Sequence, residues 1–179
     1  MANTLTKDIV LGSGKLYIAK FTEGSSFDLS TVAVAANQVG LIQGGASLEY
    51  KPSTYEVKDD LCQVYKRFIT SEEATLKSGI LTWNLEALNS IVGNKDYEAT
   101  DSKRTLKLGG NGAREMEQFA VVFEHTKTDG KAIRVGVVGT NEAGLSLTFA
   151  ADKETVVDAE FKAIGHDDAG TLVVIEEDI

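Results

Sequence analysis

Hydrophobic and polar residues alternate in short runs along most of the chain, and Gly, Asn or Asp bound many of these runs. An alternation with a period of two places successive side chains on opposite faces of a strand. The pattern predicts strands at residues 14–21, 39–50, 54–58, 63–70, 72–83, 104–108, 119–125, 131–138, 145–149, 156–164 and 171–175. We therefore expect a mainly β fold of roughly ten strands, a β-sandwich or barrel-like domain.

One segment departs from this period and is predicted to be a short flanking α-helix at about residues 85–92. Its apolar residues recur at helical spacing; they are Leu85, Leu88, Ile91 and Val92. Asn84 is a suitable N-cap and Gly93 a suitable end. Trp83, just before the helix, is expected in the core. The polar stretches 23–36 and 94–102 are predicted to be loops.

The most unusual feature is a long hairpin predicted at residues 48–70, with its turn at Asp59-Asp60. It interleaves charged and aromatic residues on both faces, and the Gly44-Gly45 pair before it suggests a bulge. Pro52 cannot donate to a β-ladder and marks a strand edge or corner. An isolated hairpin is marginal in water. We expect an arm that packs against another chain, and a ribbon folded back on its own domain remains the alternative.

Length and composition indicate one domain, residues 1–179, with a formal charge of −9 and a sequence pI of about 4.7. Such acidity argues against a protein that wraps nucleic acid, which needs a basic surface. The single Cys62 excludes an intrachain disulfide and a multi-Cys zinc site. The sequence shows neither an apolar membrane span nor a signal peptide, so we expect function without export through a membrane.

Candidate chemistry is sparse, and we expect no catalytic residue, cofactor or metal. The sequence Gly12-Ser13-Gly14-Lys15 lacks the spacing of a phosphate loop. A metal could bind at His166-Asp167-Asp168, but these residue types also favour a plain turn. His125 is expected to be structural and Cys62 to be a buried or idle thiol. The acidic residues Asp96, Glu98 and Asp101 do not match a calcium loop. An enzyme with carboxylates distant in sequence stays a further alternative.

Several ordered segments resemble the tail tube (major tail) proteins of tailed bacteriophages and the tubes of contractile injection systems. The first run is GGASLEYKP at residues 44–52, followed by YEVK at 55–58, EEATL at 72–76 and WNLEAL at 83–88. The second is DKETVVDAEFKAI at 152–164, followed by GTLVVI at 170–175. The resemblance covers most of the chain, and the order of the segments is more specific than any one of them. Residues 25–37 do not match the family.

The resemblance implies a β-sandwich or split barrel with one helix and a long arm. Six copies would close into a ring, their inner sheets joining into one barrel, and rings would stack into a tube in the virion tail. The implied partners are tape measure, terminator, baseplate or tip and possibly sheath proteins, and assembly would occur in the bacterial cytoplasm. The arm residues expected to bridge subunits are Tyr50, Lys51, Pro52, Tyr55, Glu56, Lys58, Tyr65 and Lys66. The residues before Ile9 and the C-terminal residues 176–179 could bridge as well.

The acidic charge then suggests a role for the lumen. Six copies would carry six times −9, or −54, formal charges. An acidic wall repels the phosphates of double-stranded DNA, so the DNA would slide through without specific binding. The residues expected at the lumen are Glu49, Glu56, Glu73 and Lys77. The competing interpretation is a small β-sandwich module that binds carbohydrate or a cell-surface partner, which would need an exposed aromatic platform.

Overall fold

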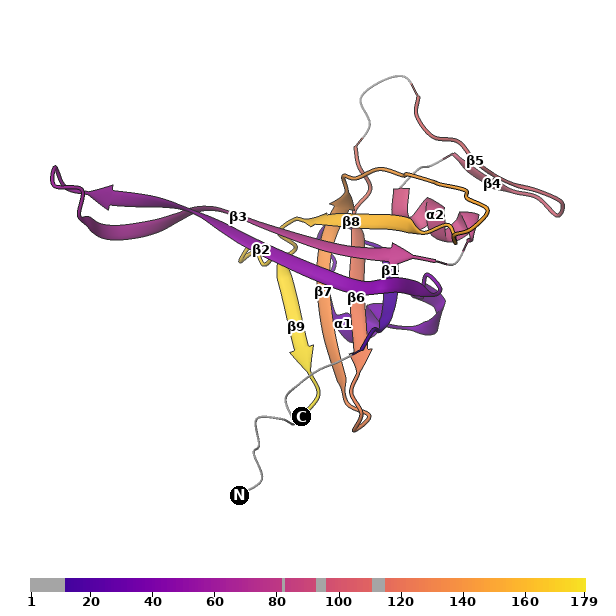
Figure 1. Ribbon diagram of the computed structural model, residues 1–179, viewed down its shortest axis with the longest axis horizontal. Helices are drawn as coiled ribbons and strands as arrows, with labels where there is room; N and C mark the ends of the chain where they lie inside the picture. Colours follow the sequence, from indigo (N-terminus) through magenta and orange to yellow (C-terminus); the bar gives the residue numbers. More distant parts are fainter. Residues whose placement is uncertain (1–11, 82, 93–95, 111–114) are drawn as a thin grey trace.

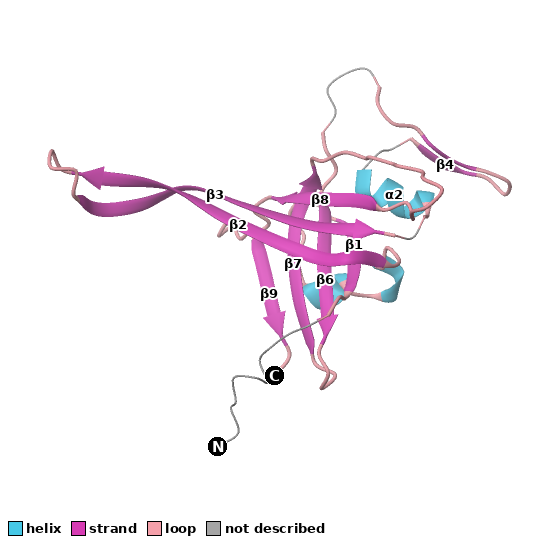
Figure 2. Ribbon diagram, viewed as in Figure 1, coloured by secondary structure: helices cyan, strands magenta, loops and turns pink. Residues whose placement is uncertain are grey.

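The computed structural model describes residues 12–81, 83–92, 96–110 and 115–179, and it is mainly β (Figure 2). The large antiparallel sheet contains β1 (Lys15–Lys20), β6 (Phe119–Thr126), β7 (Ala132–Asn141), β8 (Val157–Ala163), β3 (Val64–Ile80) and β2 (Ile42–Lys58), in that order. A further strand, β9 (Val173–Glu177), pairs with β7. A separate two-stranded sheet consists of β4 (Tyr97–Ala99) and β5 (Arg104–Leu106). The described residues form no closed barrel.

Strand β7 joins two parts of the sheet. Its first half pairs with β9 over residues 133–137, and its last residues pair with β8 over 139–141. Gly139 permits the close approach to β8, because a Cβ there would lie 2.2 Å from the carbonyl oxygen of Lys162. Figure 1 shows β2, β3 and β8 running across the direction of β6, β7 and β9. The sheet therefore bends around the main core.

The main core lies between the two directions of the sheet and beneath helix α2 (Leu85–Val92). It contains buried residues from five strands and this helix, namely Leu16, Ile18, Leu76, Ile80, Leu88, Ile91, Phe119, Val121, Val137, Val157, Ala159 and Phe161, together with Val39. The predicted helix is confirmed: Asn84 Oδ1 accepts the N–H of Glu86 at its first turn. The end predicted at Gly93 lies outside the described residues.

The opposite face of β1, β6 and β7 is covered by the segment that was predicted to be a loop at residues 23–36. That prediction is wrong in part, because the segment contains α1 (Leu29–Val32) and the 3-10 turn η2 (Ala35–Asn37). Asp28 caps α1 by accepting the N–H groups of Ser30 and Thr31. Leu29 and Val32 are buried in a second cluster with Tyr17, Ala120, Val122 and Val138. The two faces of β1 are therefore both covered, as its apolar residues on both sides require.

Several further strand predictions need correction. Residues 39–50 and 54–58 were predicted as separate strands, and so were 63–70 and 72–83. The structure has one continuous strand in each case, β2 over residues 42–58 and β3 over residues 64–80. Residues 145–149 form no strand; Leu145 and Leu147 instead pack against the core from a loop. The predicted loop at 94–102 contains β4, which pairs with β5 from Tyr97 to Ala99. The β6–β7 hairpin and strands β1, β8 and β9 are confirmed within a few residues.

Candidate subunit interface on the β2–β3 arm

Strands β2 and β3 form an arm that projects far beyond the rest of the sheet (Figure 1). Each strand has 17 residues. β8 pairs with β3 from Thr75 to Ile80, so β2 is the one described strand that pairs with residues 64–74. At about 3.3 Å per residue, this part of the ribbon extends roughly 35 Å. The long hairpin predicted from the sequence is confirmed, and β2 is the edge strand that Pro52 predicts.

The turn at the tip is built around Asp59, as predicted. Asp59 Oδ1 accepts the N–H groups of Leu61 and Gln63 over 3.1 and 2.8 Å, and Oδ2 accepts the Tyr65 hydroxyl over 3.1 Å. Cys62 adopts a φ of 61°, an uncommon conformation for a residue other than Gly, and its side chain is exposed. The thiol was expected to be buried or idle; the structure excludes the buried state and places this cysteine at the end of the arm.

One face of the distal arm, which we define as residues 54–58 and 64–69, is aromatic. Tyr55 pairs with Phe68 and Val57 pairs with Lys66, so these four side chains share a face. Tyr55 is 62% exposed and Phe68 is 46% exposed. The Lys66 ammonium lies 4.7 Å from the centre of the Phe68 ring. We call Tyr55, Val57 and Phe68 the aromatic face of the arm.

The other face of the distal arm is charged. Glu56 pairs with Arg67, whose Nε donates to Glu56 Oε1 over 2.8 Å, and Lys58 Nζ lies 3.0 Å from Oε2. The Lys58 ammonium, and then the Arg67 guanidinium, lower the pKa of the Glu56 carboxyl below its ordinary value. The Glu56–Arg67 pair joins the two strands in a part of the arm where no third described strand pairs with them, and the Glu56–Lys58 pair lies within β2.

The residues predicted for subunit contact fall into two groups along the arm. Tyr50, Lys51 and Pro52 lie near its root, where the Tyr50 hydroxyl donates to Glu72 and this bond raises the pKa of Tyr50. Tyr55, Glu56, Lys58, Tyr65 and Lys66 lie in the distal arm and near the tip. The sequence interpretation omitted Phe68 and Val57 from the contact set. A register shift between Ser53 and Thr54 determines which residues share their face, and alternation alone could not locate that shift.

Three of the four residues predicted for the lumen share the outer face of β2, β3 and β8. Lys51 pairs with Glu73, Glu49 with Thr75, and Lys77 with Glu160, on the side away from Leu48 and Leu76. Ion pairs connect this face: Lys51–Glu49 at 2.5 Å, Lys77–Glu160 at 2.9 Å and Lys162–Glu73 at 3.8 Å. Glu56 lies apart from these three residues in the distal arm, beyond the register shift between Ser53 and Thr54.

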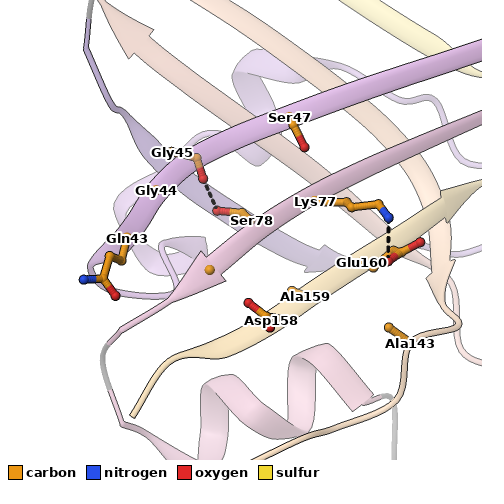
Figure 3. A pocket seen from close by; sticks show the side chains of 11 residues that line it. Gln43, Gly44, Gly45, Ser47, Lys77, Ser78, Ala143, Asp158, Ala159 and Glu160 are labelled. Carbon is orange, nitrogen blue, oxygen red and sulfur yellow. Dashed lines mark hydrogen bonds and ion pairs between the residues drawn. The ribbon is translucent and has the colours of Figure 1, made fainter. Parts of the chain in front are cut away.

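A shallow hollow of about 350 Å³ lies at one end of this outer face (Figure 3). The Gly44-Gly45 pair forms its wall at a register shift in β2, confirming the predicted bulge, with φ values of 79° and 73°. Ser78 Oγ donates to the Gly45 carbonyl over 2.9 Å and fixes the bulge. Lys77 and Glu160 pair with each other at its rim, and the carboxylate of Asp158 also lines the hollow.

A second exposed aromatic site lies at the other end of β3. Trp83 is 50% exposed, which corrects the prediction of a core position, and Phe149 is 72% exposed. Their ring centroids are 5.5 Å apart at 60°. Leu145 and Leu147 pack into the core and Thr155 Oγ1 donates to the Thr148 carbonyl, so the loop that carries Phe149 is held in place. We call Trp83 and Phe149 the aromatic pair.

The C-terminal residues are held by their own chain. β9 pairs with β7, and Asp178 accepts from the Ala132 N–H and from Arg134 Nη1 over 3.1 Å each. These bonds and the nearby charges lower the pKa of Asp178. Glu176 and Glu177, expected to reach a neighbour, pair with Arg134 and Ile133 of the same chain. The residues before Ile9 lie outside the described part.

Two of the remaining polar candidates, Asp167 and His125, have structural partners. Asp167 Oδ1 accepts the N–H groups of Ala169 and Thr171, which confirms a turn after His166. His125 Nδ1 lies 2.7 Å from the Ser13 carbonyl oxygen. Within the described ranges, no three His, Cys, Asp or Glu residues gather as metal ligands, and no helix has the length and apolar character to cross a membrane.

No family model matches the chain, and no curated protein matches it.

Proposed function

We propose that this chain is a structural subunit of a bacteriophage tail tube or of a related contractile injection particle, and not an enzyme. The observation that carries the proposal is the arm. It extends roughly 35 Å beyond the third strand that supports its root, and it presents Tyr55 and Phe68 to solvent. An isolated hairpin with exposed aromatic residues gains stability when another surface covers it. Another copy of the same chain is the partner that a repeating tube supplies.

In this proposal, β1, β6, β7 and β9 form one layer of a β-sandwich or split barrel, and β8, β3 and β2 form the other. Six copies close into a ring, and the inner sheets join through edges such as β1 and β2, which end the strand order in the monomer. Closure removes exposed edges that would otherwise pair without control. Stacked rings then make the tube of the virion tail, assembled in the bacterial cytoplasm with tape measure, terminator, baseplate or tip and, in a contractile tail, sheath proteins.

The outer face of β2, β3 and β8 is the surface that we assign to the lumen. Its lysines, Lys51, Lys77 and Lys162, each lie within 4 Å of a carboxylate of the same chain. Paired lysines offer DNA no basic stripe, and a hexamer would carry −54 formal charges, six times −9. Double-stranded DNA would therefore pass without specific binding. Glu49, Glu73 and Lys77 belong to this wall, whereas Glu56 belongs to the arm.

Electron microscopy of the purified chain at high concentration, with light scattering at low concentration, tests the proposal. We expect hollow tubes or six-fold rings from the native sequence, and monomers from the variant Tyr55→Thr/Phe68→Thr. Met116→Ala, which changes another exposed apolar residue, is the control and should assemble normally. A native chain that remains monomeric under all these conditions would contradict self-assembly.

The exposed aromatic pair favours a second candidate, a module that binds carbohydrate or a cell-surface partner. Aromatic rings provide a flat apolar surface with defined geometry, and the correction at Trp83 supplies the platform that this alternative requires. Trp83 is the only tryptophan in the chain. A titration with N-acetylglucosamine oligomers would shift its fluorescence if this function holds, and an unchanged spectrum at millimolar sugar would count against it.

A further inference from the structure

We propose that the aromatic pair, Trp83 and Phe149, is the docking surface for the distal arm of a second copy of this chain. The inference rests on the assembly function proposed above and adds the partner surface. The two sites are on one molecule, and both expose large apolar side chains to solvent.

The two surfaces cannot meet within one copy. The aromatic face lies in the distal arm, and Trp83 follows the opposite end of β3, which ends at Ile80. The 17 residues of β3 span roughly 50 Å at 3.3 Å each. Figure 1 shows the tip of the arm and the other end of β3 on opposite sides of the molecule. Any contact between them therefore joins two copies.

The charges of the two surfaces are complementary. The face of the distal arm that bears Tyr55 and Phe68 also carries the cation Lys66, whereas Glu56 pairs with Arg67 on the opposite face. The loop that carries Phe149, residues 142–156, has the opposite balance. It contains Glu142, Asp152 and Glu154 against the single cation Lys153. The cation on the aromatic face, Lys66, thus meets a loop with an excess of two negative charges, which favours this pairing and orients it.

The aromatic pair is also preorganised to receive the arm. Its loop is held by the packing of Leu145 and Leu147, by the Thr155–Thr148 hydrogen bond, and by a contact of Glu154 with Gln43 on β2. Trp83 is placed directly before the N-cap of α2, where Arg104 Nη1 donates to Asn84 Oδ1 over 3.4 Å. A surface that is already ordered loses little conformational entropy on binding.

A contact between two different surfaces of one chain is heterologous. Such an interface repeats from copy to copy and produces rings or filaments, because two joined copies together keep one unused arm and one unused docking surface. It also makes a specific prediction for mixtures: two variants that each lack one surface can still join once, through the two surfaces that remain.

The experiment combines two variants. The arm variant, Tyr55→Thr/Phe68→Thr, keeps the docking surface and the only tryptophan. The docking variant, Trp83→Thr/Phe149→Ser, keeps the arm and emits no tryptophan fluorescence. Fluorescence of the mixture therefore reports only on Trp83 of the arm variant. The control partner carries all four substitutions, and circular dichroism establishes that each variant is folded.

We expect each variant alone to remain monomeric and an equimolar mixture to give a one-to-one dimer by sedimentation, with a blue shift of Trp83 emission. The four-fold variant should produce neither change. A mixture with no dimer and no blue shift overturns the inference.

If the native chain still forms tubes although the mixture does not dimerise, the assembly function stands and only this contact is wrong. If the mixture dimerises but the native chain forms no ring or tube, the contact stands and the tube function fails. A Trp83 response to N-acetylglucosamine oligomers without a response to the docking variant overturns the inference in favour of the carbohydrate module.

Discussion

Arg67 on β3 and Glu56 on β2 face each other across the distal arm, and Arg67 Nε donates to Glu56 Oε1 over 2.8 Å. Lys58 Nζ approaches the other carboxylate oxygen at 3.0 Å. Among the described strands, no third one pairs with the ribbon at this point. The Glu56–Arg67 ion pair therefore joins β2 to β3, and Lys58, on the same strand as Glu56, adds a second positive charge beside the carboxylate.

This relationship predicts that acid loosens the distal arm before the body of the protein. The pKa of Glu56 lies below its ordinary value of 4.5 because Lys58 and Arg67 stabilise the ionised form. A group whose pKa is lowered in the folded state stabilises that state above its ordinary pKa, and the contribution disappears as the pH falls through the lowered value. Amide protection factors in the distal arm should fall as the pH drops below 4.5. Glu56→Gln should already show the lower protection at neutral pH and lose most of this pH dependence.

The free monomer should also show a gradient of hydrogen exchange along the arm. Residues 50–70 have one paired strand over most of their length, whereas β6 and β7 lie in the middle of the sheet and contribute several buried residues to the core. Local opening requires less free energy where few buried contacts are lost. Mass spectrometry of exchanged peptides should find 50–70 largely unprotected and 119–141 protected. Strong protection of the arm in a monomer would indicate a rigid ribbon and contradict this prediction.

The sequence predicted the arm well because its signals are local. Alternation, the turn at Asp59 and the bulge at Gly44-Gly45 each depend on a few neighbouring residues. The aromatic face was harder to predict from the sequence, since the register shift between Ser53 and Thr54 determines that Phe68 shares a face with Tyr55. That shift depends on how two distant segments pair. The same limit applies to Trp83, whose exposure depends on the loop of residues 142–156 and not on its own neighbours.

The strand predicted at residues 145–149 was wrong for a different reason. Their alternation of Leu145, Leu147 and Phe149 is the pattern of a strand, and the two leucines do pack into the core. This segment does not pair with β7, the strand before it, because β7 is already paired on both sides, with β6 along one edge and with β9 and β8 along the other. A periodic pattern indicates which side chains are buried, but a strand also needs an open edge next to it.

The core should depend strongly on Phe161. This residue is 1% exposed, and its ring centroid lies 6.3 Å from that of Phe119. Removing a buried aromatic side chain typically costs about 3–5 kcal/mol, since the lost transfer energy adds to the cost of the cavity. Denaturant unfolding should show a loss of that size for Phe161→Ala. Phe149→Ala, at a 72% exposed position, is the matched control and should change the free energy of unfolding by no more than about 0.5 kcal/mol. Equal losses in the two variants would contradict the assignment of the core.

Gly136 should be intolerant of a side chain. It lies in β7 beneath α1, and a Cβ there would lie 2.1 Å from Leu29 Cδ2 and 2.8 Å from Phe27 Cζ. Gly136→Ala should destabilise the protein by about 1–3 kcal/mol through overpacking. Adding Gly136→Ala to the variant Leu29→Ala should cost less free energy of unfolding than adding it to the native chain, because the smaller side chain at residue 29 makes room for the new Cβ. A double-mutant cycle without coupling would show that α1 does not pack on β7 as described.

Reversing charge on the outer face of β2, β3 and β8 should slow DNA movement through an assembled tube. In the variant Glu49→Lys/Glu73→Lys, Lys51 and Lys162 lose their carboxylate partners, and the face gains cations that attract phosphate. Tubes should still form, because these side chains point away from the core. We expect DNA release from particles built with this variant to slow several-fold and to recover at high salt, since salt screens the attraction. Glu23→Lys/Glu98→Lys changes the net charge equally at exposed residues elsewhere and should release DNA at the native rate. Equal release rates in both variants and the native particle would show that this face does not line the lumen.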